Sequence, residues 1–158
     1  MLYKTILVPL DGSELAECSL AHVQAVASGC NVTDVILLTV VEPLPTYTVS
    51  SFLEAGTAGG DMLKKAETDK EAEATRYVTM MADKLKAQGI AARPVVVSGN
   101  AADTILDYAT NNQVDMIIMS THGRSGISRW AYGSVADRVS RHAGVPVLLI
   151  APAGCRNI

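Results

Sequence analysis

Residues 115–135 read DMIIMSTHGRSGISRWAYGSV, a stretch in which an apolar run leads through a loop rich in glycine and hydroxyl groups into a helical pattern. A strand that continues into a helix through such a loop points unpaired backbone N–H groups and the positive end of the helix dipole at one place. Arg124 adds positive charge there and Ser134 adds a hydroxyl. The loop also has three glycines that let backbone approach a ligand closely, Gly123, Gly126 and Gly133. The stretch therefore predicts an anion site of the kind that holds phosphate.

Short apolar runs rich in branched residues recur along the chain. They predict five strands, at 5–10, 34–41, 93–98, 115–120 and 145–150. Their near-continuous apolar character is typical of strands covered on both faces, as in a parallel sheet. Between them, apolar residues recur at helical spacing, and Ser13 stands where a helix cap is expected.

The alternation of strands and helices predicts an α/β fold in which a five-stranded parallel sheet has helices on both faces. We expect the strand order 3-2-1-4-5 in a single domain spanning residues 1–158. In this order the sheet reverses between the first and fourth strands, and such sheets bind ligands at the carboxyl edge of that switch point. The first strand ends there near Asp11, and the fourth ends there at Met119 and Ser120.

The composition argues against several classes of partner. With a formal net charge of -3, the chain has no long-range attraction for nucleic acid or for an anionic membrane surface, so we expect neither as a partner. No apolar run reaches the roughly 18 residues that a membrane helix needs. The three cysteines lack the spacing of a zinc site and predict unpaired thiols in a cytoplasmic protein.

Residues 43–60 interrupt the alternation with two prolines and three glycines. The segment is too long for a simple connection between a strand and a helix. We therefore expect a long loop here, either a flap over the site or a mobile surface segment.

Several stretches together resemble one known family. Ser120-Thr121-His122-Gly123, followed after nine residues by Gly133-Ser134, is similar to the signature G-x-x-G-x9-G-[ST] of nucleotide-binding universal stress proteins. The resemblance extends over nearly the whole chain and includes KTILVPLDGS at 4–13, VILLTV at 35–40, VDMIIM at 114–119 and VPVLL at 145–149.

The resemblance implies a Rossmann-like sandwich of the adenine nucleotide alpha hydrolase type. It further implies that the protein forms a homodimer through the last strand, from Val145 to Ile150. ATP, or alternatively ADP or AMP, would lie between the first and fourth strands, with Mg²⁺ as its companion ion.

The same resemblance assigns roles to single residues. Pro9 and Leu10 would flank the base, Asp11 would contact the ribose or adenine side, and the Val40 backbone would face adenine. The phosphates would be wrapped by Gly123, Gly133, Ser134 and Val135, with Arg124 beside them. The expected site is completed by Met119, Ser120 and Gly126.

One position departs from the signature, because its first glycine is Ser120 in this chain. If that position needs a positive φ, serine costs about 1 kcal/mol, or roughly a fivefold loss of affinity, unless its hydroxyl donates to a phosphate. Two other interpretations stay open. Asp11 at a strand end also suits a turn or a helix cap, and the loop glycines also suit tight turning alone.

These observations predict an ATP-binding universal stress protein, acting as a nucleotide-dependent regulator or stress-tolerance factor with an unidentified regulatory protein partner. No general base, nucleophile or P-loop lysine can be assigned, so we expect any ATP hydrolysis to be slow or partner-dependent. The alternative is a dimeric interaction module that binds AMP or no nucleotide. An adenylyl transferase on a related fold is a third hypothesis, which no adenylation signature supports.

Overall fold

In the computed structural model, which describes residues 2–54, 56–121 and 133–151, the predicted strands form one parallel sheet. Its order is β3-β2-β1-β4-β5, which confirms the predicted order and the α/β class. The last strand begins two residues later than expected, after Pro146, whose carbonyl accepts from the Ile117 N–H at 2.9 Å. The strands are β1 (Thr5–Pro9), β2 (Asp34–Val41), β3 (Ala92–Ser98), β4 (Met116–Ser120) and β5 (Val147–Ile150).

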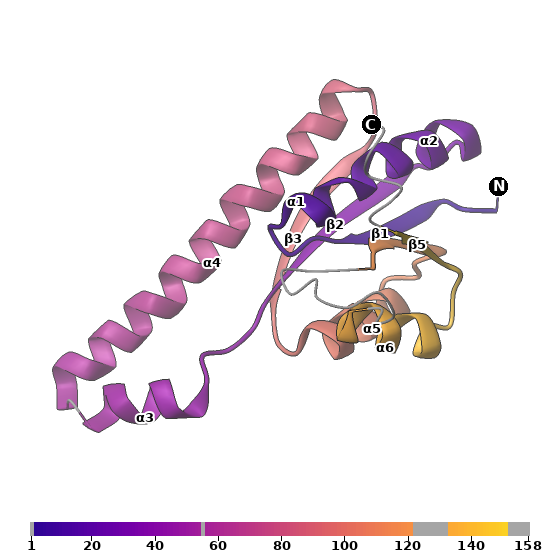
Figure 1. Cartoon of the computed structure of the whole chain (residues 1–158). Helices are drawn as coiled ribbons and strands as arrows, with labels where there is room; N and C mark the ends of the chain where they lie inside the picture. Colours follow the sequence, from indigo (N-terminus) through magenta and orange to yellow (C-terminus); the bar gives the residue numbers. More distant parts are fainter. Residues whose placement is uncertain (1, 55, 122–132, 152–158) are drawn as a thin grey trace.

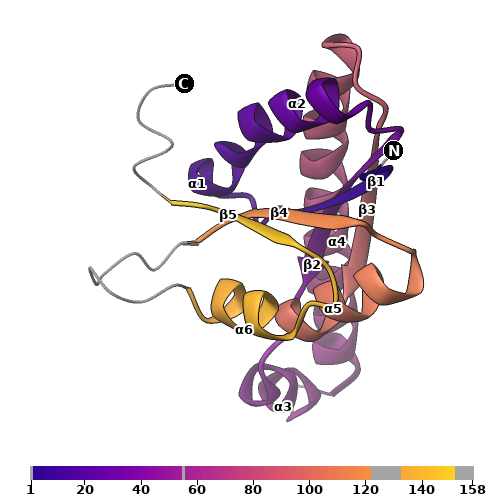
Figure 2. The same ribbon diagram turned by 90° about the vertical axis from the view of Figure 1, so that its right-hand side faces the viewer.

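Helices cover both faces of the sheet. Within the described residues they are α1 (Glu14–Glu17), α2 (Ser19–Cys30), α3 (Thr46–Glu54), α4 (Gly56–Ala87), α5 (Ala101–Asn111) and α6 (Ser134–His142). Figures 1 and 2 show α1, α2 and α4 on one side of the sheet and α5 and α6 on the other. The continuous apolar character of the strands is explained by this arrangement, because the central strands β1, β2 and β4 bury residues on both faces.

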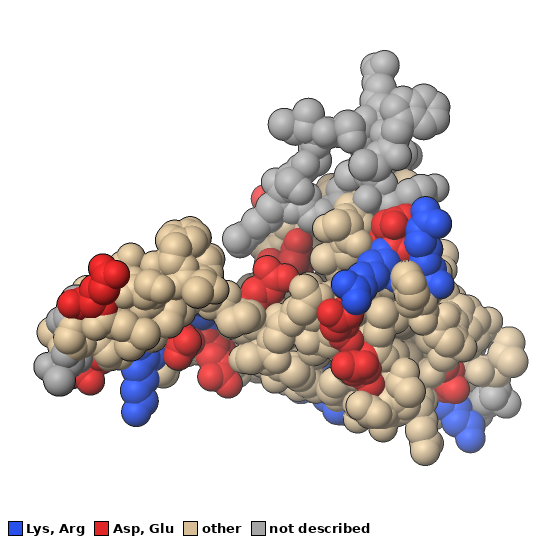
Figure 3. Space-filling view, turned by 90° about the horizontal axis from the view of Figure 1, so that it is seen from below, with Lys and Arg blue, Asp and Glu red and all other residues tan. Residues whose placement is uncertain are grey.

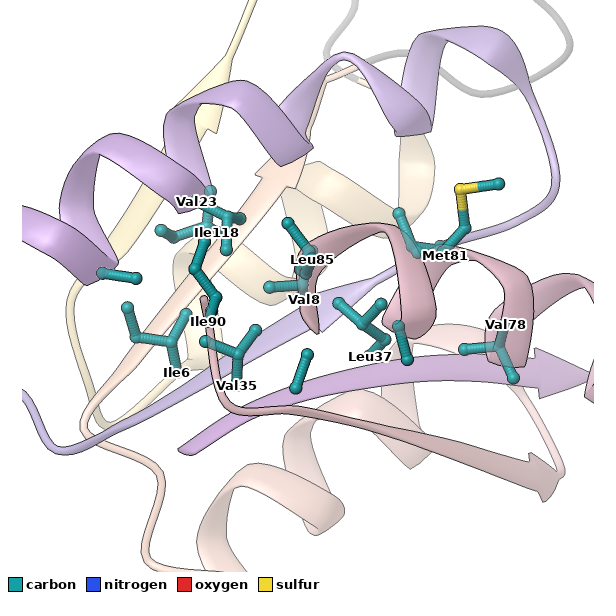
Figure 4. Close-up of a cluster of buried hydrophobic side chains, with 14 of the residues drawn as sticks. Ile6, Val8, Val23, Val35, Leu37, Val78, Met81, Leu85, Ile90 and Ile118 are labelled. Atoms are coloured by element: carbon teal, nitrogen blue, oxygen red, sulfur yellow. The ribbon is translucent and has the colours of Figure 1, made fainter. Parts of the chain in front are cut away.

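Two hydrophobic cores result, one on each face. Alternate residues of β1 divide between them: Ile6 and Val8 join the core under α2 and α4, and Leu7 joins the core over α5 and α6. In the first core, shown in Figure 4, Leu85 of α4 lies with Val8 among side chains that are almost fully buried. Burial of a side chain of this size contributes about 1.5–3 kcal/mol, so these layers fix the sheet firmly.

The pairing of β1 with β4 is short and lies toward the amino ends of the strands. The Asp115 carboxylate, just before β4, accepts from the Lys4 N–H at 2.7 Å and from the Thr5 N–H at 2.9 Å. Register pairs follow only at Ile6↔Met116 and Leu7↔Ile117. The two strands are therefore joined at their amino ends, and their pairing stops before their carboxyl ends.

The expectation of a long loop at 43–60 is wrong, because most of this segment is helical. The carbonyl of Pro45 accepts from Thr48 and Val49 as α3 begins, and Gly56, with a φ of 71°, is the first residue of α4. The Ser50 and Ser51 hydroxyls donate hydrogen bonds to backbone carbonyls one helical turn earlier, those of Thr46 and Tyr47. The prolines and glycines therefore mark the ends of two helices instead of a structureless loop.

The prediction of three unpaired thiols is correct for Cys30, which is free and exposed. It is wrong for Cys18, which is disulfide-bonded. Cysteine spacing along a chain does not show which sulfur atoms meet in the fold, so this error could not be avoided from the sequence. Because one of the cysteines is disulfide-bonded, the cysteines no longer support the expected cytoplasmic location.

Candidate functional site

A pocket of about 200 Å³ opens at the carboxyl edge of the sheet, where β1 and β4 separate. It is lined by the ends of β1, β2 and β4 and by residues of α1, α5 and α6. This is the switch point at which the strand order reverses. The pocket therefore lies at the carboxyl edge of the sheet, where the sequence analysis predicts a ligand site.

Nine of the twelve residues assigned to the site from the sequence line this pocket. They come from three strand ends and from the start of α6: Pro9, Leu10, Asp11, Val40, Met119, Ser120, Gly133, Ser134 and Val135. The other three, Gly123, Arg124 and Gly126, lie outside the described residues. Whether the nine bind a ligand stays a prediction, but they do lie together.

The sequence did not single out six further lining residues, namely Ala16, Leu38, Ala101, Ile105, Thr121 and Ala136. Thr121 and Ala136 are chain neighbours of expected residues, and Leu38 lies two positions before Val40 on the same strand. Ala101 and Ile105 belong to α5 and form a wall from another part of the chain. Asn100, which caps α5 through its Oδ1 and the Asp103 N–H at 3.3 Å, is the local signal that a helix begins at this edge.

The backbone of Val40 faces the pocket without a strand partner. Even-numbered residues of β2 direct their backbone groups toward β1: the Asp34 N–H donates to Lys4 at 3.0 Å, and the Leu38 carbonyl accepts from Leu10 at 2.8 Å. Val40 follows the same alternation, but the register of β1 with β2 ends at Pro9↔Leu38. Within the described part of the chain, Val40 therefore presents an unpaired N–H donor beside an unpaired carbonyl acceptor.

Asp11 is held in a tight turn that leads into α1. Its Oδ1 accepts from the Ser13 N–H at 3.0 Å and from the Ser13 hydroxyl at 2.6 Å, and Ser13 Oγ accepts from Ala16 N–H at 3.1 Å as the helix cap. Gly12 adopts a φ of 80°, which favours glycine. Asp11 therefore does stabilise a turn, which is one of the two roles that the sequence analysis considered for it. The second carboxylate oxygen has no partner among the described residues and remains an acceptor at the pocket.

The first turn of α6 also opens onto the pocket. Gly133 is its N-cap and supplies no side chain, and the first helical bond runs from the Asp137 N–H to the Gly133 carbonyl at 2.9 Å. The preceding N–H groups, of Ser134, Val135 and Ala136, have no intrahelical acceptor. They and the helix dipole favour an anion at this end of the pocket.

Ser120 sits in this site without backbone strain. It is the last residue of β4 and pairs in register with Ile150. Among the described residues other than glycine, only Asn31 and Gln113 have a positive φ. The penalty considered for a serine at this position therefore does not apply in this conformation, and what remains is the effect of its side chain on a ligand.

The walls of the pocket are mainly apolar, with Leu38, Ile105 and Met119 buried. Asp11 is the sole charged side chain among the described lining residues. In the described ranges we find no group of three or more His, Cys, Asp or Glu residues that could hold a metal ion. Of the helices that the structure describes, none is long and apolar enough to cross a membrane.

Comparison with known proteins identifies relatives along almost the whole chain. Universal stress protein MJ0577 of Methanocaldococcus jannaschii is 30% identical over 156 residues, which cover 95% of this chain and 96% of that protein. A universal stress protein of Thermus aquaticus is 27% identical, with coverage of 94% and 99%.

Solved structures of related proteins share the fold. Hypothetical protein MJ0577 has a TM-score of 0.79 at 28% identity, covering 96% of this chain and 97% of its own. Two universal stress proteins at 20% identity and a TM-score of 0.64 were solved with nucleotides: one with cAMP, covering 96% and 98%, and one of Archaeoglobus fulgidus with dAMP, covering 95% and 99%. The model of the universal stress protein family matches residues 2–151. The chain therefore belongs to the universal stress protein family.

Proposed function

We propose that the pocket binds the adenine base of ATP, ADP or AMP, and that the protein is a nucleotide-dependent regulator or stress-tolerance factor. The observation that carries the proposal is the unpaired backbone of Val40 at the pocket wall. Adenine presents an amino donor beside a ring-nitrogen acceptor, which matches one carbonyl and one N–H. Guanine presents the opposite order, a carbonyl acceptor beside a ring N–H, so its carbonyl would face the Val40 carbonyl and its ring N–H would face the Val40 N–H.

The rest of the pocket suits the other parts of a nucleotide. Its apolar walls accept the faces of a flat base, and the free carboxylate oxygen of Asp11 can accept from ribose hydroxyls. A volume of about 200 Å³ is below the ~300–1,000 Å³ of sites that enclose whole drug-sized ligands, so the phosphates would extend to the mouth, beside the N-terminus of α6. Gly123, Arg124 and Gly126 would complete that end, and Mg²⁺ would be held by the phosphates.

Related proteins support an adenine nucleotide as the ligand. Universal stress proteins of the same fold bind cAMP and dAMP, so this architecture accommodates an adenine base. We expect turnover of bound ATP to be slow, because Asp11 is the sole ionisable side chain among the described lining residues and one of its carboxylate oxygens is already engaged by Ser13.

The proposal is tested by calorimetric titration of the purified protein with AMP, ADP, ATP and GMP, with and without Mg²⁺. We expect binding of the adenine nucleotides, and weakening of about tenfold or more for GMP, because a mispaired donor and a mispaired acceptor each cost about 1–3 kcal/mol. No heat with any adenine nucleotide at millimolar concentration would refute the proposal. Equal affinity for AMP and GMP would refute the role of Val40 specifically.

A second candidate, the dimeric interaction module, is favoured by the position of β5. This strand is the edge of the sheet, and its residues Val147, Leu148 and Leu149 are only half-buried. An open edge with apolar side chains invites pairing with a second copy. Sedimentation equilibrium without nucleotide is expected to show a dimer, whereas a monomer at tens of micromolar would remove this candidate.

A further inference from the structure

Tyr77 lies where helix α4 leaves the body of the protein. After it, Val78, Met81 and Leu85 bury α4 against the sheet, whereas each residue from 67 to 73 is exposed. The part of α4 before this point forms a hairpin with α3, which extends away from the sheet in Figure 1 and forms a lobe beside the body in Figure 3. A contact made by Tyr77 therefore acts at the base of the hairpin.

The hairpin itself takes no part in the pocket. Its tip, residues 46–54 and 56–66, exposes the large apolar side chains of Tyr47, Leu53 and Met62, and none of its described residues lines the pocket. A flap over the nucleotide site, one of the two roles considered for 43–60, is therefore not what this segment forms. The base of α4, in contrast, packs beside α1, which does line the pocket.

The Tyr77 hydroxyl is buried next to the candidate site without a hydrogen bond. It is one of three such side-chain atoms in the described structure, together with His22 Nε2 and Thr39 Oγ1. A buried polar group costs free energy unless it is bonded, so such groups are few in native proteins and call for an explanation. Tyr77 packs against the core that includes Leu10 and Ala16, both of which line the pocket. The explanation is therefore to be sought at the pocket.

The groups around the hydroxyl belong to α1 and to the turn before it. Burial raises the pKa of Tyr77 above its usual value, and the negative charges of Glu17 and Asp11 raise it further. The Gly12 N–H acts on this pKa in the opposite direction, as a donor beside the hydroxyl oxygen does. Independently, Lys84 Nζ lies 3.9 Å from Glu17 Oε2, and Lys84 is two helical turns after Tyr77 on the same face of α4. The hydroxyl thus lies beside a carboxylate acceptor and a backbone donor and bonds to neither.

Gly12 belongs to the turn that holds the carboxylate of Asp11 at the pocket. One oxygen of that carboxylate accepts from Ser13, and the other is available to a ligand. The Gly12 N–H has no acceptor among the described residues, and Gly12 is exposed, so water can accept from it in the free protein. Because Gly12 has no side chain, the turn can adjust there at little cost. Donor and acceptor are therefore both available for a bond that the free protein does not make.

We propose that Tyr77 is a positioning residue that fixes this turn to α4 when a nucleotide binds, an inference that rests on the proposed function of the pocket. Ribose hydroxyls that donate to Asp11 favour one arrangement of the turn. In that arrangement the Gly12 N–H donates to the Tyr77 oxygen, and the Tyr77 O–H donates to the Glu17 carboxylate. Both bonds remove the cost of the buried hydroxyl, so they add to nucleotide affinity.

The same bonds connect the occupied site to the base of the hairpin. In the free protein the turn and α4 meet without a hydrogen bond at Tyr77, and in the bound protein they are joined. The hairpin is therefore held more firmly when nucleotide is present. A nucleotide-dependent regulator needs a surface that differs between its free and bound states, and this coupling supplies one.

Calorimetric titration of the wild type and of Tyr77→Phe with AMP tests the inference. We expect the variant to bind AMP about fivefold more weakly, which is the contribution of one neutral hydrogen bond. Its unfolding free energy should not fall, because it buries no unsatisfied hydroxyl. Weaker binding by a protein that is no less stable distinguishes a positioning role from a merely structural one. With 2′,3′-dideoxy-AMP, which has no ribose hydroxyl to donate to Asp11, the two proteins should bind equally.

Hydrogen–deuterium exchange measures the coupling to the hairpin. Saturating AMP is expected to slow amide exchange in residues 64–76 of the wild type and to leave this segment unchanged in Tyr77→Phe. Tyr47→Phe is the matched control, because Tyr47 is 75% exposed on α3 and lies outside the pocket. It should behave as the wild type does in both experiments.

The outcomes separate this inference from the proposed function. If the wild type binds no adenine nucleotide, both are refuted. If the wild type binds AMP and Tyr77→Phe binds it equally well, only the inference about Tyr77 is overturned. It is likewise overturned if the variant loses the same factor with AMP and with 2′,3′-dideoxy-AMP, if its loss of affinity comes with a loss of stability, or if AMP leaves exchange in residues 64–76 of the wild type unchanged.

Discussion

The pocket and the hairpin tip both leave apolar surface open to solvent, but the chain supports them in opposite ways. The pocket lies between strands whose residues, such as Leu7 and Leu38, are fully buried, and its polar groups are fixed by the backbone. The tip of the α3–α4 pair, residues 46–54 and 56–66, is built from contacts between the two helices and is reached through an exposed stretch of α4 at 67–73. A rigid hollow with directed donors and acceptors suits a small ligand, whereas a protruding apolar lobe suits a macromolecular partner.

The largest effect should come from filling the pocket. Gly133→Val places a branched side chain at the N-cap of α6, where phosphates are expected, and we predict a loss of nucleotide affinity of at least about tenfold, or about 1.4 kcal/mol. Gly133 has a φ of −49°, so valine is compatible with the backbone and the fold should survive. Isothermal titration with AMP and ATP measures the effect.

Gly144→Val is the matched control for that substitution. A Cβ at Gly144 meets nothing within 4 Å, and the residue lies outside the pocket. Its nucleotide affinity should equal that of the wild type. If Gly133→Val binds nucleotide as well as Gly144→Val does, the ligand does not lie against the α6 N-terminus.

The two regions also differ in how far the sequence predicts them. The strands were found because runs such as 35–38 and 116–119 are apolar throughout, and parallel strands of this kind place their carboxyl ends at one edge. Nine expected residues meet there because they all lie at strand ends or at the helix start that follows. Ile105 was missed because a helical apolar pattern shows that a residue is buried but not which cavity it borders.

The hairpin was missed for a different physical reason. Proline and glycine are strong signals for the ends of helices, and in 43–60 they outweigh the weak helical preference of a segment rich in serine and threonine. The helices form although hydroxyls such as those of Ser50 and Ser51 bond to carbonyls of the helix itself, and α3 packs along α4. The contact between α3 and α4 is a tertiary effect that residue propensities do not include.

A smaller effect, on stability, is expected from a change at the amino ends of β1 and β4. The two strands are joined there, whereas the pocket lies at their carboxyl ends. Asp115→Asn weakens the acceptor of two backbone N–H groups, and we predict a loss of about 1 kcal/mol of unfolding free energy at pH 7, low for charged hydrogen bonds because solvent screens the site. Urea denaturation measures it.

The same residue gives a pH dependence with a defined sign. The N–H groups of Thr5 and Lys4 favour the ionised carboxylate and hold the pKa of Asp115 below its usual value in the folded protein. Its stabilisation is therefore complete above the unfolded pKa of about 3.9 and is lost as the pH falls through the lower, folded value. The stability difference between wild type and Asp115→Asn should shrink below about pH 4. A constant difference across that range would show that the charge is not involved.

Helix α4 serves both regions, and Tyr77 lies on its packed half. The Tyr77 hydroxyl is buried without a hydrogen-bond partner in the described structure, and burial raises its pKa, with further contributions from the negative charges of Glu17 and Asp11. Tyr77→Phe should therefore increase the unfolding free energy by up to about 1 kcal/mol. Thermal denaturation tests this. A clear destabilisation would show that the hydroxyl takes part in a hydrogen bond in solution, for which the Glu17 carboxylate and the Gly12 N–H are the candidate partners.

The smallest effect is expected from the double variant Leu53→Ser with Met62→Ser when no partner is present. Both side chains are already exposed in the free protein, so their loss should change the unfolding free energy by less than about 0.5 kcal/mol and leave nucleotide affinity unaltered. Leu85→Ala, on the packed half of the same helix and 2% exposed, should instead cost about 2–5 kcal/mol. If the double variant destabilises the protein as Leu85→Ala does, the tip is part of the folded core in solution.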